Sequence, residues 1–584
     1  MVDPISVEVI RAALHAAAEE MKICMLKTTY SPILNEARDF GCAIFDTEGQ
    51  MIAEAVGLPL FQGHLGWPVL ATIRDRGWED IHPGDIFIHN DPYDGGGNHL
   101  NDVVMFAPCF AGDEPFGFVV TKAHWVDVGG SVPGSMAVDT TEFYQEGLRL
   151  QSLKLFQRGA ENRDVWRVIT ANIRTETGVM KDIRAMIATC HTGRRRLQEL
   201  IERYGAATLQ ESCQIIMTQS ERRTRKALAA LPDGTYQAQG WLDNDGIDLD
   251  KPLRIAVTIT ISGSDMQVDL SACEPQVQGP FNCGDAITIS ACRFVLKCFT
   301  TPHDPNDEGC FRPLQVTLPP GLIVSAQAPA SVSRYFTPLL LLIELMFRAL
   351  APALRETITA ANYGDHMPTI VYGLRPDSQT PFIHADLNAG GNGARADGDG
   401  ESALIIMAAS AVRNTPIEVS ETKYPFVHYT RYGLRQDSGG AGTYRGGLGI
   451  VREWMYGTAV AGTFTLERSV TPPWGLDGGH TGDINDLTIT DADGNSRQVR
   501  KGTRVPIQAG SVVRIQTGGG GGYGDPLARR VESVQTDVLD GYCSLESARE
   551  QYGVVLDADT LSIDRPQTTA LRRTRCASQN GGTR

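Results

Sequence analysis

The sequence predicts a multidomain α+β protein, in which a mixed α/β N-terminal region with long helices is followed by β-rich domains. Its 584 residues exceed the roughly 250–300 residues that one hydrophobic core usually serves. Apolar residues follow helical spacing over long stretches of the first half, whereas short apolar runs and glycine-rich turns fill the last third. Apolar residues make up 42% of the chain and charged residues 21%, which is typical of a folded protein.

The first predicted helix begins at Asp3-Pro4, because Asp is a favoured N-cap and Pro fits the first turn. Apolar residues recur with helical spacing from Ile10 to Met25, and we expect the helix to end near Tyr30. Short segments rich in Val, Ile and Phe then alternate with Gly, Pro and Asp, a pattern that indicates strands. These strands are expected at residues 41–45, 85–89, 103–106 and 118–121.

A strongly helical segment is predicted over residues 162–231, with apolar residues on one stripe and charged residues opposite. Leu231-Pro232-Asp233-Gly234 ends this segment and marks a domain boundary. Alternating apolar residues over 255–270, interrupted by a turn at 262–265, predict a hairpin. Further helices are expected at residues 286–299, 338–350 and 544–552. The predicted domains are a metal-binding α/β and helical region (1–231), a mixed α+β domain (232–430), a Gly-rich β-domain with a short C-terminal helix (431–566) and a flexible tail (567–584).

Charge and composition exclude several classes of partner. The net charge of −16 disfavours a nucleic acid or an anionic membrane. The strongest apolar run, residues 339–350, is interrupted by Glu344 and Arg348 and is too short to span a bilayer about 30 Å thick. The 12 cysteines form no CxxC pair, and no basic segment followed by an apolar one opens the chain. We therefore expect a cytoplasmic protein with reduced thiols.

Histidine and aspartate occur together twice within a short stretch of a chain that has only 12 histidines. His99 and Asp102 are three residues apart, and so are His124 and Asp127. Imidazole nitrogen and carboxylate oxygen form the mixed ligand set that suits zinc, manganese or iron, with a position left for water. The His99–Asp102 pair alone is better explained as a loop histidine bonded to a nearby aspartate. Both pairs together, with the acidic loop at 35–39, favour a metal site.

Other motifs carry weaker signals. The glycine runs at residues 439–449 and 518–524 could present backbone N–H groups to a phosphate, but no P-loop Gly-Lys-Ser/Thr follows, and tight turns that need positive φ explain them better. His64 is either a pocket residue or an ordinary loop histidine. The cysteines that could be nucleophiles have no neighbouring His and are interpreted as buried thiols: Cys109, Cys283 and Cys310.

The chain resembles the hydantoinase B/oxoprolinase family over nearly its whole length. The motifs that carry the resemblance include Asn90-Asp91-Pro92-Tyr93, His99-Leu100-Asn101-Asp102 and Gly309-Cys310-Phe311-Arg312-Pro313. Further matching segments are residues 35–41, 63–66, 124–130, 414–418, 437–440, 444–447 and 520–526. The resemblance implies that ATP and Mg are bound by a separate, actin-like A subunit, in a hetero-oligomer such as α2β2. This chain would hold a divalent metal and perform the carbonyl chemistry.

The resemblance also implies which residues form the site. The divalent metal, Zn, Mn or Fe, would be held by Asp39, His99, Asp102 and His124. The catalytic candidates are Glu36, His64 and Asp127, with Asp127 orienting a ligand histidine or the water. At residues 333–336, where the family pattern is rich in Gly and Asn, this chain has Ser-Arg-Tyr-Phe. Its specificity is therefore expected to differ from that of the hydantoin enzymes.

The function that follows is ATP-dependent hydrolysis of a cyclic amide, such as a hydantoin, a lactam or a cyclic imide. A bound divalent metal lowers the pKa of its water from about 16 towards 7, which supplies a nucleophile for a poor electrophile. Phosphorylation by the partner would trap the adduct. Two alternatives remain: a subunit of an ATP-dependent ketone carboxylase of the acetone or acetophenone type, which would need bicarbonate, and a non-catalytic scaffold, which would not need a set of metal ligands.

Overall fold

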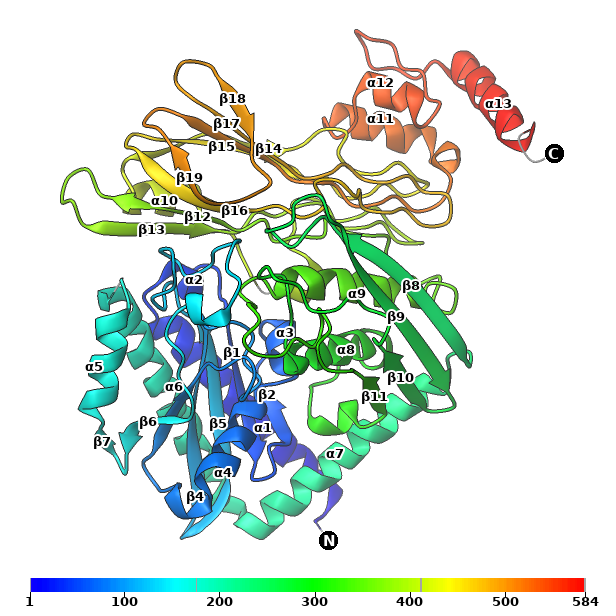
Figure 1. The fold of residues 1–584 in the computed structure, drawn as a ribbon. Helices are drawn as coiled ribbons and strands as arrows, with labels where there is room; N and C mark the ends of the chain where they lie inside the picture. Colours follow the sequence, from blue (N-terminus) through cyan, green and yellow to red (C-terminus); the bar gives the residue numbers. More distant parts are fainter. Residues whose placement is uncertain (1, 175, 410–411, 582–584) are drawn as a thin grey trace. The chain divides into compact units, whose positions relative to one another are not determined.

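The computed structural model describes residues 2–174, 176–409 and 412–581, drawn as a ribbon in Figure 1. The chain forms two compact units, each discontinuous in sequence. Unit 1 comprises Met1–Ala349, Ile370–Ala385 and Ala408–Thr415, and unit 2 comprises Leu350–Thr369, Asp386–Met407 and Pro416–Arg584. The boundary predicted at residue 231 therefore lies inside unit 1, and the one predicted at residue 430 lies inside unit 2.

An antiparallel 7-stranded sheet forms the centre of unit 1, with the strand order β2-β1-β5-β4-β3-β6-β7. Its strands are β1 (Phe40–Asp46), β2 (Met51–Glu54), β3 (Ile86–His89), β4 (Asp102–Ala111), β5 (Glu114–His124), β6 (Leu153–Gln157) and β7 (Ala160–Glu161). β1, β5 and β4 are neighbours and are buried along most of their length. The strands predicted from their Val, Ile and Phe content are confirmed.

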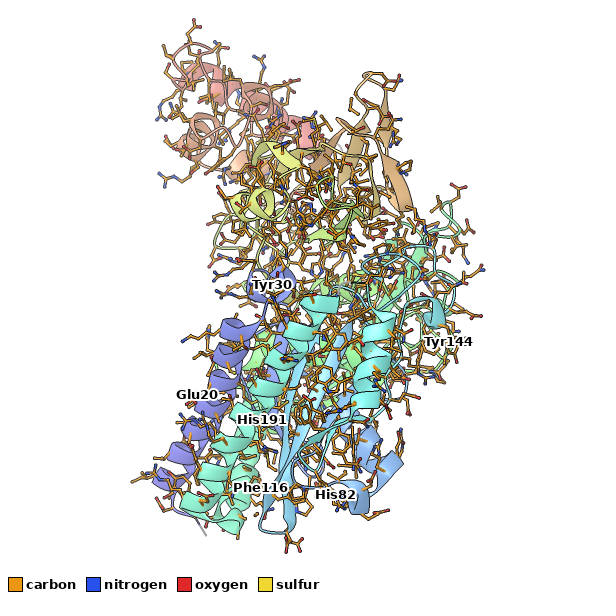
Figure 2. All side chains as sticks on the ribbon, turned by 90° about the vertical axis from the view of Figure 1, so that its left-hand side faces the viewer. Glu20, Tyr30, His82, Phe116, Tyr144 and His191 are labelled. Atoms are coloured by element: carbon orange, nitrogen blue, oxygen red, sulfur yellow. The ribbon has the colours of Figure 1, made fainter. Side chains whose placement is uncertain are left out.

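Long helices pack on this sheet. Helix α1 (Pro4–Thr28) contacts β1 and β2, and helix α6 (Glu176–Tyr204) contacts α1, β4 and β5. The start of α1 is as predicted, because the Asp3 carboxylate accepts from the backbone N–H groups of Ile5 and Ser6. Figure 2 shows α1 and α6 side by side, with Glu20 on α1, where it accepts from Arg196 of α6 at 2.6 Å. Helices α5 (Arg163–Asn172) and α7 (Ala206–Leu228) complete the predicted helical segment.

A second sheet of unit 1 has the strand order β11-β10-β9-β8. Its strands are β8 (Gly234–Leu242), β9 (Leu253–Ser262), β10 (Asp265–Asp269) and β11 (Leu314–Thr317), and the β9–β10 pair is the predicted hairpin. The helices α8 (Asp285–Thr300) and α9 (Phe336–Leu350) confirm the two predicted for this segment. Shorter elements are α2 (Pro32–Asn35), α3 (Pro59–Gln62), α4 (Trp67–Arg76), η1 (Trp78–Asp80), η2 (Phe143–Gln145) and η3 (Glu308–Phe311).

Unit 2 contains a 5-stranded antiparallel sheet with the order β14-β15-β20-β17-β18, and β16 pairs with β19. The strands are β14 (Val427–Leu434), β15 (Ile450–Tyr456), β16 (Val460–Thr465), β17 (Asp486–Thr490), β18 (Ser496–Gln498), β19 (Lys501–Ile507) and β20 (Val512–Gln516). Its helices are α10 (Ile417–Lys423), η5 (Pro526–Ala528), α11 (Val531–Leu539), α12 (Leu545–Glu550) and α13 (Arg565–Gly581). β12 (Thr369–Leu374), β13 (Pro381–Asp386) and η4 (Met407–Ala409) lie where the chain passes from one unit to the other.

Helix α13 occupies most of the segment that the sequence predicted to be a flexible tail. Arg572 fixes it, because the guanidinium donates to the carbonyl oxygens of Tyr552 at 3.0 Å and Arg529 at 2.9 Å. Residues 582–584 of the predicted tail lie outside the described residues. Together the helices and sheets confirm the α+β class.

The glycine runs of unit 2 pack backbone against backbone. The N–H groups of Gly520, Gly521 and Gly522 donate to the carbonyl oxygens of Gly447, Ala361 and His480 at 2.8–2.9 Å. A Cβ at Gly520 would lie 1.9 Å from the carbonyl oxygen of Asn392, and of these three none has positive φ. The predicted reason for the glycines is therefore wrong here: they are required by close approach of main chains rather than by left-handed turns. Their N–H groups are already paired within the unit.

In the part of the chain that the structure describes, no helix combines the length and the apolar character needed to cross a bilayer.

Candidate metal centre

The neighbouring strands β1, β5 and β4 place three of the predicted ligands at one end of the unit 1 sheet. Asp102, the first residue of β4, is the register partner of His124, the last residue of β5. Phe40 opens β1 opposite Ala123 of β5, and the N–H of His124 donates to the carbonyl oxygen of Asp39 at 3.2 Å. The antiparallel register thus brings together residues that are up to 85 positions apart in sequence, from Asp39 to His124.

His99 joins this group through a tight turn before β4, in which the N–H of Asp102 donates to the carbonyl oxygen of His99 at 3.0 Å. One nitrogen or oxygen atom from each of His99, Asp102 and His124 lies within 4.8 Å of the others. His99 Nε2 is 3.4 Å from Asp102 Oδ1, and the ring centroids of His99 and His124 are 5.0 Å apart. All three side chains are buried.

Hydrogen bonds fix which atoms of this trio face one another. Nδ1 of His99 donates to the carbonyl oxygen of Ser333 at 3.2 Å, which leaves the lone pair on Nε2. Oδ2 of Asp102 accepts from Asn98 Nδ2 at 3.0 Å and from the Tyr335 hydroxyl at 3.2 Å, which leaves Oδ1. The Ser-Arg-Tyr-Phe segment that departs from the family pattern therefore contacts two of the predicted ligands directly, through Ser333 and Tyr335.

The atoms left over have no hydrogen-bond partner. His99 Nε2, Asp102 Oδ1 and His124 Nδ1 are buried and unpartnered, and so is Oδ1 of Asp39. Orphaned polar atoms in an interior cost roughly 1–3 kcal/mol each, more for charged groups, so a convergent set of them needs an explanation. Two imidazole nitrogens and carboxylate oxygens are the donor set of a zinc, manganese or iron site. The residues present therefore fit a divalent cation.

Asp39 lies beside the trio without belonging to the set whose atoms are all within 4.8 Å of one another. Burial and the negative charge of Asp102 raise its pKa, and Lys122 opposes this effect. At Asp102 burial also works against ionisation, but Lys122 and His99 outweigh it and lower the pKa. The negative charge of one carboxylate thus disfavours ionisation of the other, and a bound divalent cation would stabilise both negative charges. Asp39 as a fourth ligand stays a prediction.

Lys122 is a site residue that the sequence did not reveal. Its side chain is fully buried, with Nζ 3.4 Å from Asp102 Oδ2, 3.1 Å from His64 Nε2 and 4.0 Å from the centroid of the Phe61 ring. Burial lowers the pKa of Lys122, and Asp102 opposes this. The signal was available, because Lys122 and His124 are two residues apart on one strand and therefore point to the same face.

His64 is brought to the site through this lysine. Burial and then Lys122 hold its pKa well below the usual value, so the imidazole is neutral and its Nε2 accepts from Lys122. Nδ1 of His64 is buried and unpartnered. Of the two interpretations left open for His64, the pocket residue is the one that this placement supports.

Asp127 and Glu36 are not brought to the trio. The Asp127 carboxylate accepts from the N–H of Arg174 at 2.8 Å, from Arg174 Nη1 at 2.9 Å and from the Ser135 hydroxyl at 3.2 Å. These contacts tie a loop together, and in the described residues no hydrogen bond joins Asp127 to a ligand histidine. Ser333, not Asp127, orients His99. Glu36 caps the C-terminal end of α2, and among the described residues no bond links its side chain to the trio.

Comparisons with known proteins match nearly the whole chain. The model of the hydantoinase B/oxoprolinase family matches residues 3–526. A protein of Pseudomonas sp. (strain NS671), named as the B subunit of a putative D-/L-hydantoinase, is 34% identical, over 98% of this chain and 98% of its own. The crystal structure of ATP-dependent caprolactamase from Pseudomonas jessenii has a TM-score of 0.91 at 31% identity, covering 98% of this chain and 100% of that one. An acetone carboxylase structure, at 20% identity, has a TM-score of 0.92 over 100% of this chain and 84% of that one, which shows a shared fold.

Proposed function

Because the chain belongs to the hydantoinase B/oxoprolinase family, we propose that it is the metal-dependent B subunit of an ATP-dependent cyclic amidohydrolase. Its substrate is a hydantoin, a lactam or a cyclic imide, whose ring it opens together with an ATP-binding A subunit in the cytoplasm. The observation that carries this proposal is the convergence of buried, unpartnered ligand atoms from His99, Asp102 and His124.

The cation would be held by His99 Nε2, Asp102 Oδ1 and His124 Nδ1, with Asp39 as the fourth ligand. When bound, it would supply a water of lowered pKa and would polarise the substrate carbonyl. Ser333, Asn98 and Tyr335 hold the ligands in the orientation they already have, so little reorganisation is needed on binding. Burial of the trio excludes bulk water and strengthens every electrostatic interaction there.

Proton transfer is assigned to His64 acting beside Lys122. Ring opening requires a proton to leave the attacking water and another to reach the departing nitrogen. His64 is neutral and its Nε2 accepts from Lys122, so the ring proton is on Nδ1, which has no partner and can donate this proton to the departing nitrogen. Lys122 Nζ lies between His64 Nε2 and Asp102 Oδ2 and can stabilise negative charge that develops near the ligands.

ATP is assigned to the partner. The N–H groups of the unit 2 glycine run at Gly520–Gly522, the segment that could have cradled a phosphate, are paired with backbone carbonyls of the same unit. The relatives are named as subunits, B in one case and beta in another, which supports a hetero-oligomer such as α2β2. On this proposal, this chain binds the metal without needing its partner, whereas ATP hydrolysis requires both subunits.

The test uses the wild type and the His124→Ala and Asp39→Ala variants, each assayed with the A-type partner. We expect about one divalent metal per wild-type chain by elemental analysis, and ring opening of at least one hydantoin, lactam or imide that requires ATP. Both variants should lose metal and activity. Retention of full metal and activity in both would refute the site. Activity towards ketones that depends on bicarbonate would identify a carboxylase instead.

A further inference from the structure

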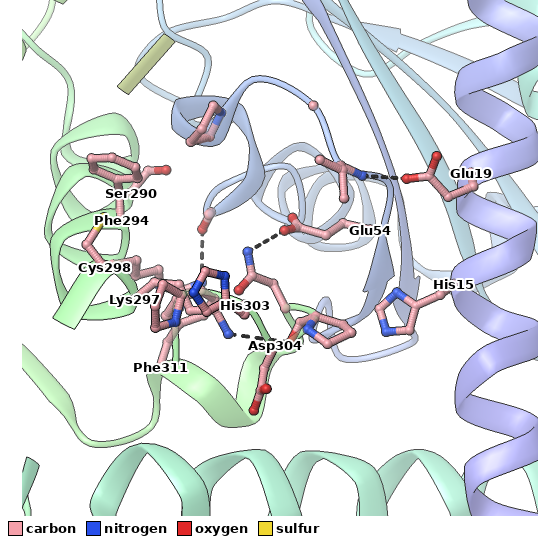
Figure 3. A pocket seen from close by; sticks show the side chains of 18 residues that line it. His15, Glu19, Glu54, Ser290, Phe294, Lys297, Cys298, His303, Asp304 and Phe311 are labelled. Atoms are coloured by element: carbon pink, nitrogen blue, oxygen red, sulfur yellow. Dashed lines mark hydrogen bonds between the residues drawn. The ribbon is translucent and has the colours of Figure 1, made fainter. Parts of the chain in front are cut away.

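Unit 1 contains a cavity of about 440 Å³, which the proposed reaction does not use. It lies between α1, β2, α8 and the loop that follows α8, and Figure 3 shows it from close by. Much of its wall is apolar: Val56, Pro59, Phe294, Pro302 and Phe311. Gly63 also lines it, whereas the next residue, His64, reaches Lys122 beside the metal centre.

Two side-chain oxygens of residues that line this cavity have no hydrogen-bond partner. Glu54 is only 7% exposed, and its Oε1 accepts from Asn306 Nδ2 at 2.5 Å, a bond drawn as a dashed line in Figure 3. The second carboxylate oxygen of Glu54, Oε2, and the amide oxygen of Asn306, Oδ1, are buried and unpartnered. Both residues line the cavity. The site is therefore short of donors and carries one carboxyl group.

The cations of the same wall are engaged elsewhere. Lys297 Nζ donates to the Thr301 hydroxyl at 2.9 Å, and Arg293 Nη2 pairs with Glu308 at 2.6 Å. Neither is hydrogen-bonded to Glu54 or Asn306 in the described residues. The two unpartnered oxygens thus belong to residues of the cavity wall, and among the described residues neither of these cations donates to them.

We propose that this cavity binds a primary ammonium group on a small apolar body. An ammonium has three N–H donors and no acceptor, so it can serve both orphaned oxygens at once. The carboxylate supplies a charge-assisted bond, and the apolar walls accept an alkyl or aryl body. A ring-opened amino acid is one member of this class, and for that ligand the inference rests on the proposed function. For simple amines it does not.

The ionisation of Glu54 gives the proposal a signature. Burial raises its pKa to about 8, with the Asn306 bond and Lys297 opposing and Asp307 adding to the effect. The other charged or titratable groups around the cavity are His15, Glu19, Arg293, His303 and Asp304. Without ligand, Glu54 is therefore largely protonated at pH 7. A bound ammonium replaces that proton, so about one proton is released per ligand.

The experiment is titration calorimetry of hexylammonium into the full chain at pH 7, in two buffers of different ionisation enthalpy. We expect binding with release of about one proton. Glu54→Gln should weaken binding at least about tenfold and abolish the release. Glu19→Gln is the matched control, because Glu19 lines the cavity but accepts from the N–H of Val56 at 2.7 Å, and it should bind like the wild type.

Three further ligands sharpen the test: hexanol, 6-aminohexanoate and ε-caprolactam. Hexanol should fail to bind, because it lacks the charge, and 6-aminohexanoate should bind if the product of a ring opening is accommodated. Equal binding of hexylammonium to the wild type and Glu54→Gln would overturn the proposal. So would tighter binding of caprolactam without proton release.

If Glu54→Gln does not fold, Asn306→Ala removes the second acceptor and serves in its place. No ATP or partner is present, so a failure here leaves the proposed function standing.

Discussion

Two clusters of buried charge, one in each unit of this protein, differ in how their atoms are partnered. In unit 2, Arg529 is nearly inaccessible, and its guanidinium bonds to Asp399 at 2.6 and 2.7 Å and to Asp537 at 2.8 and 3.1 Å. In unit 1, the buried atoms that His99, Asp102 and His124 direct at one another have no hydrogen-bond partner, and His99 Nε2 and Asp102 Oδ1 are 3.4 Å apart. In a closed network, every buried charged group is paired within the protein. In an open network, the unpaired buried atoms raise the free energy of the folded state unless a ligand pairs with them. The difference separates structural charge from a binding site.

The comparison extends to glycine. Unit 2 uses Gly520–Gly522 to bring main chains together and satisfies their N–H groups internally. In unit 1, Gly63 lines the cavity near α8, and the next residue, His64, contacts Lys122. Glycine motifs that look alike in sequence therefore have different roles. Those of unit 2 allow close packing of main chains, whereas Gly63 of unit 1 lines a cavity.

The largest effect should follow from removing a trio ligand. We expect His99→Ala to lower metal affinity by more than about 100-fold, the upper end of what loss of a supporting contact costs, and to abolish activity with the partner. His191→Ala is the control, because His191 is an exposed histidine of α6 bonded to Arg194. Elemental analysis after dialysis checks this. A metal-replete His99→Ala protein would place the open network outside the catalytic centre.

Next in size is a break in the backbone packing of unit 2. Gly520→Ala places a Cβ 1.9 Å from the carbonyl oxygen of Asn392, so main chain must move, and we expect a loss of more than about 4 kcal/mol in unfolding free energy. Gly433→Ala is the control, since nothing lies within 4 Å of its Cβ position. Urea denaturation monitored by circular dichroism measures both. Similar midpoints for the two variants would contradict the close-approach account.

The closed charge network should be sensitive to the loss of its cation alone. Arg529→Met removes the guanidinium from the buried Asp537 and the partly exposed Asp399, and we expect destabilisation of about 3 kcal/mol with no change in metal content. The exposed neighbour Arg530→Met should change stability by less than about 0.5 kcal/mol. Loss of metal from Arg529→Met would contradict the prediction that the charges around Arg529 serve stability and not metal binding.

A smaller effect is expected from the residues that orient the ligands. Asn98→Ala removes a donor to Asp102 Oδ2 and should weaken metal binding about 10–100-fold. Asn388→Ala is the comparison in unit 2: this buried side chain accepts from Arg452, so its loss should lower stability and leave metal affinity unchanged. Competition with a chromogenic chelator measures affinity. Equal affinities in the wild type and Asn98→Ala would mean that Asn98 does not orient Asp102.

Sequence reasoning succeeded where the physics is local. The start of α1 was predictable because Asp3 and Pro4 act within one turn. Metal ligands could be expected from residue type, but their meeting depends on the register of β1, β5 and β4, which spacing does not encode. The equal spacing of His124 and Asp127 was misleading, because the chain turns after β5 and directs Asp127 to Arg174. Lys122 was missed although its spacing from His124 places both on one face of a strand, because that spacing does not reveal its contacts with Asp102 and His64.

The smallest effect concerns a carboxyl group of unit 1 that is donor-rich, in contrast to the donor-poor Glu54. One oxygen of Glu146 accepts from the Ser331 hydroxyl at 2.5 Å and from the N–H groups of Val332 at 2.6 Å and Ser333 at 2.9 Å, yet burial still raises its pKa to about 7. The raised folded-state pKa favours the protonated form. Its contribution to stability is therefore complete below about pH 4.5 and is lost as the pH rises to about 7. Between pH 5 and pH 7 this loss should be at most about 2 kcal/mol.

Glu146→Gln keeps an oxygen that accepts but cannot ionise, so its denaturation midpoint should vary less over that interval than the wild-type midpoint. An unchanged slope in the variant would show that Glu146 titrates alike in the folded and unfolded chains.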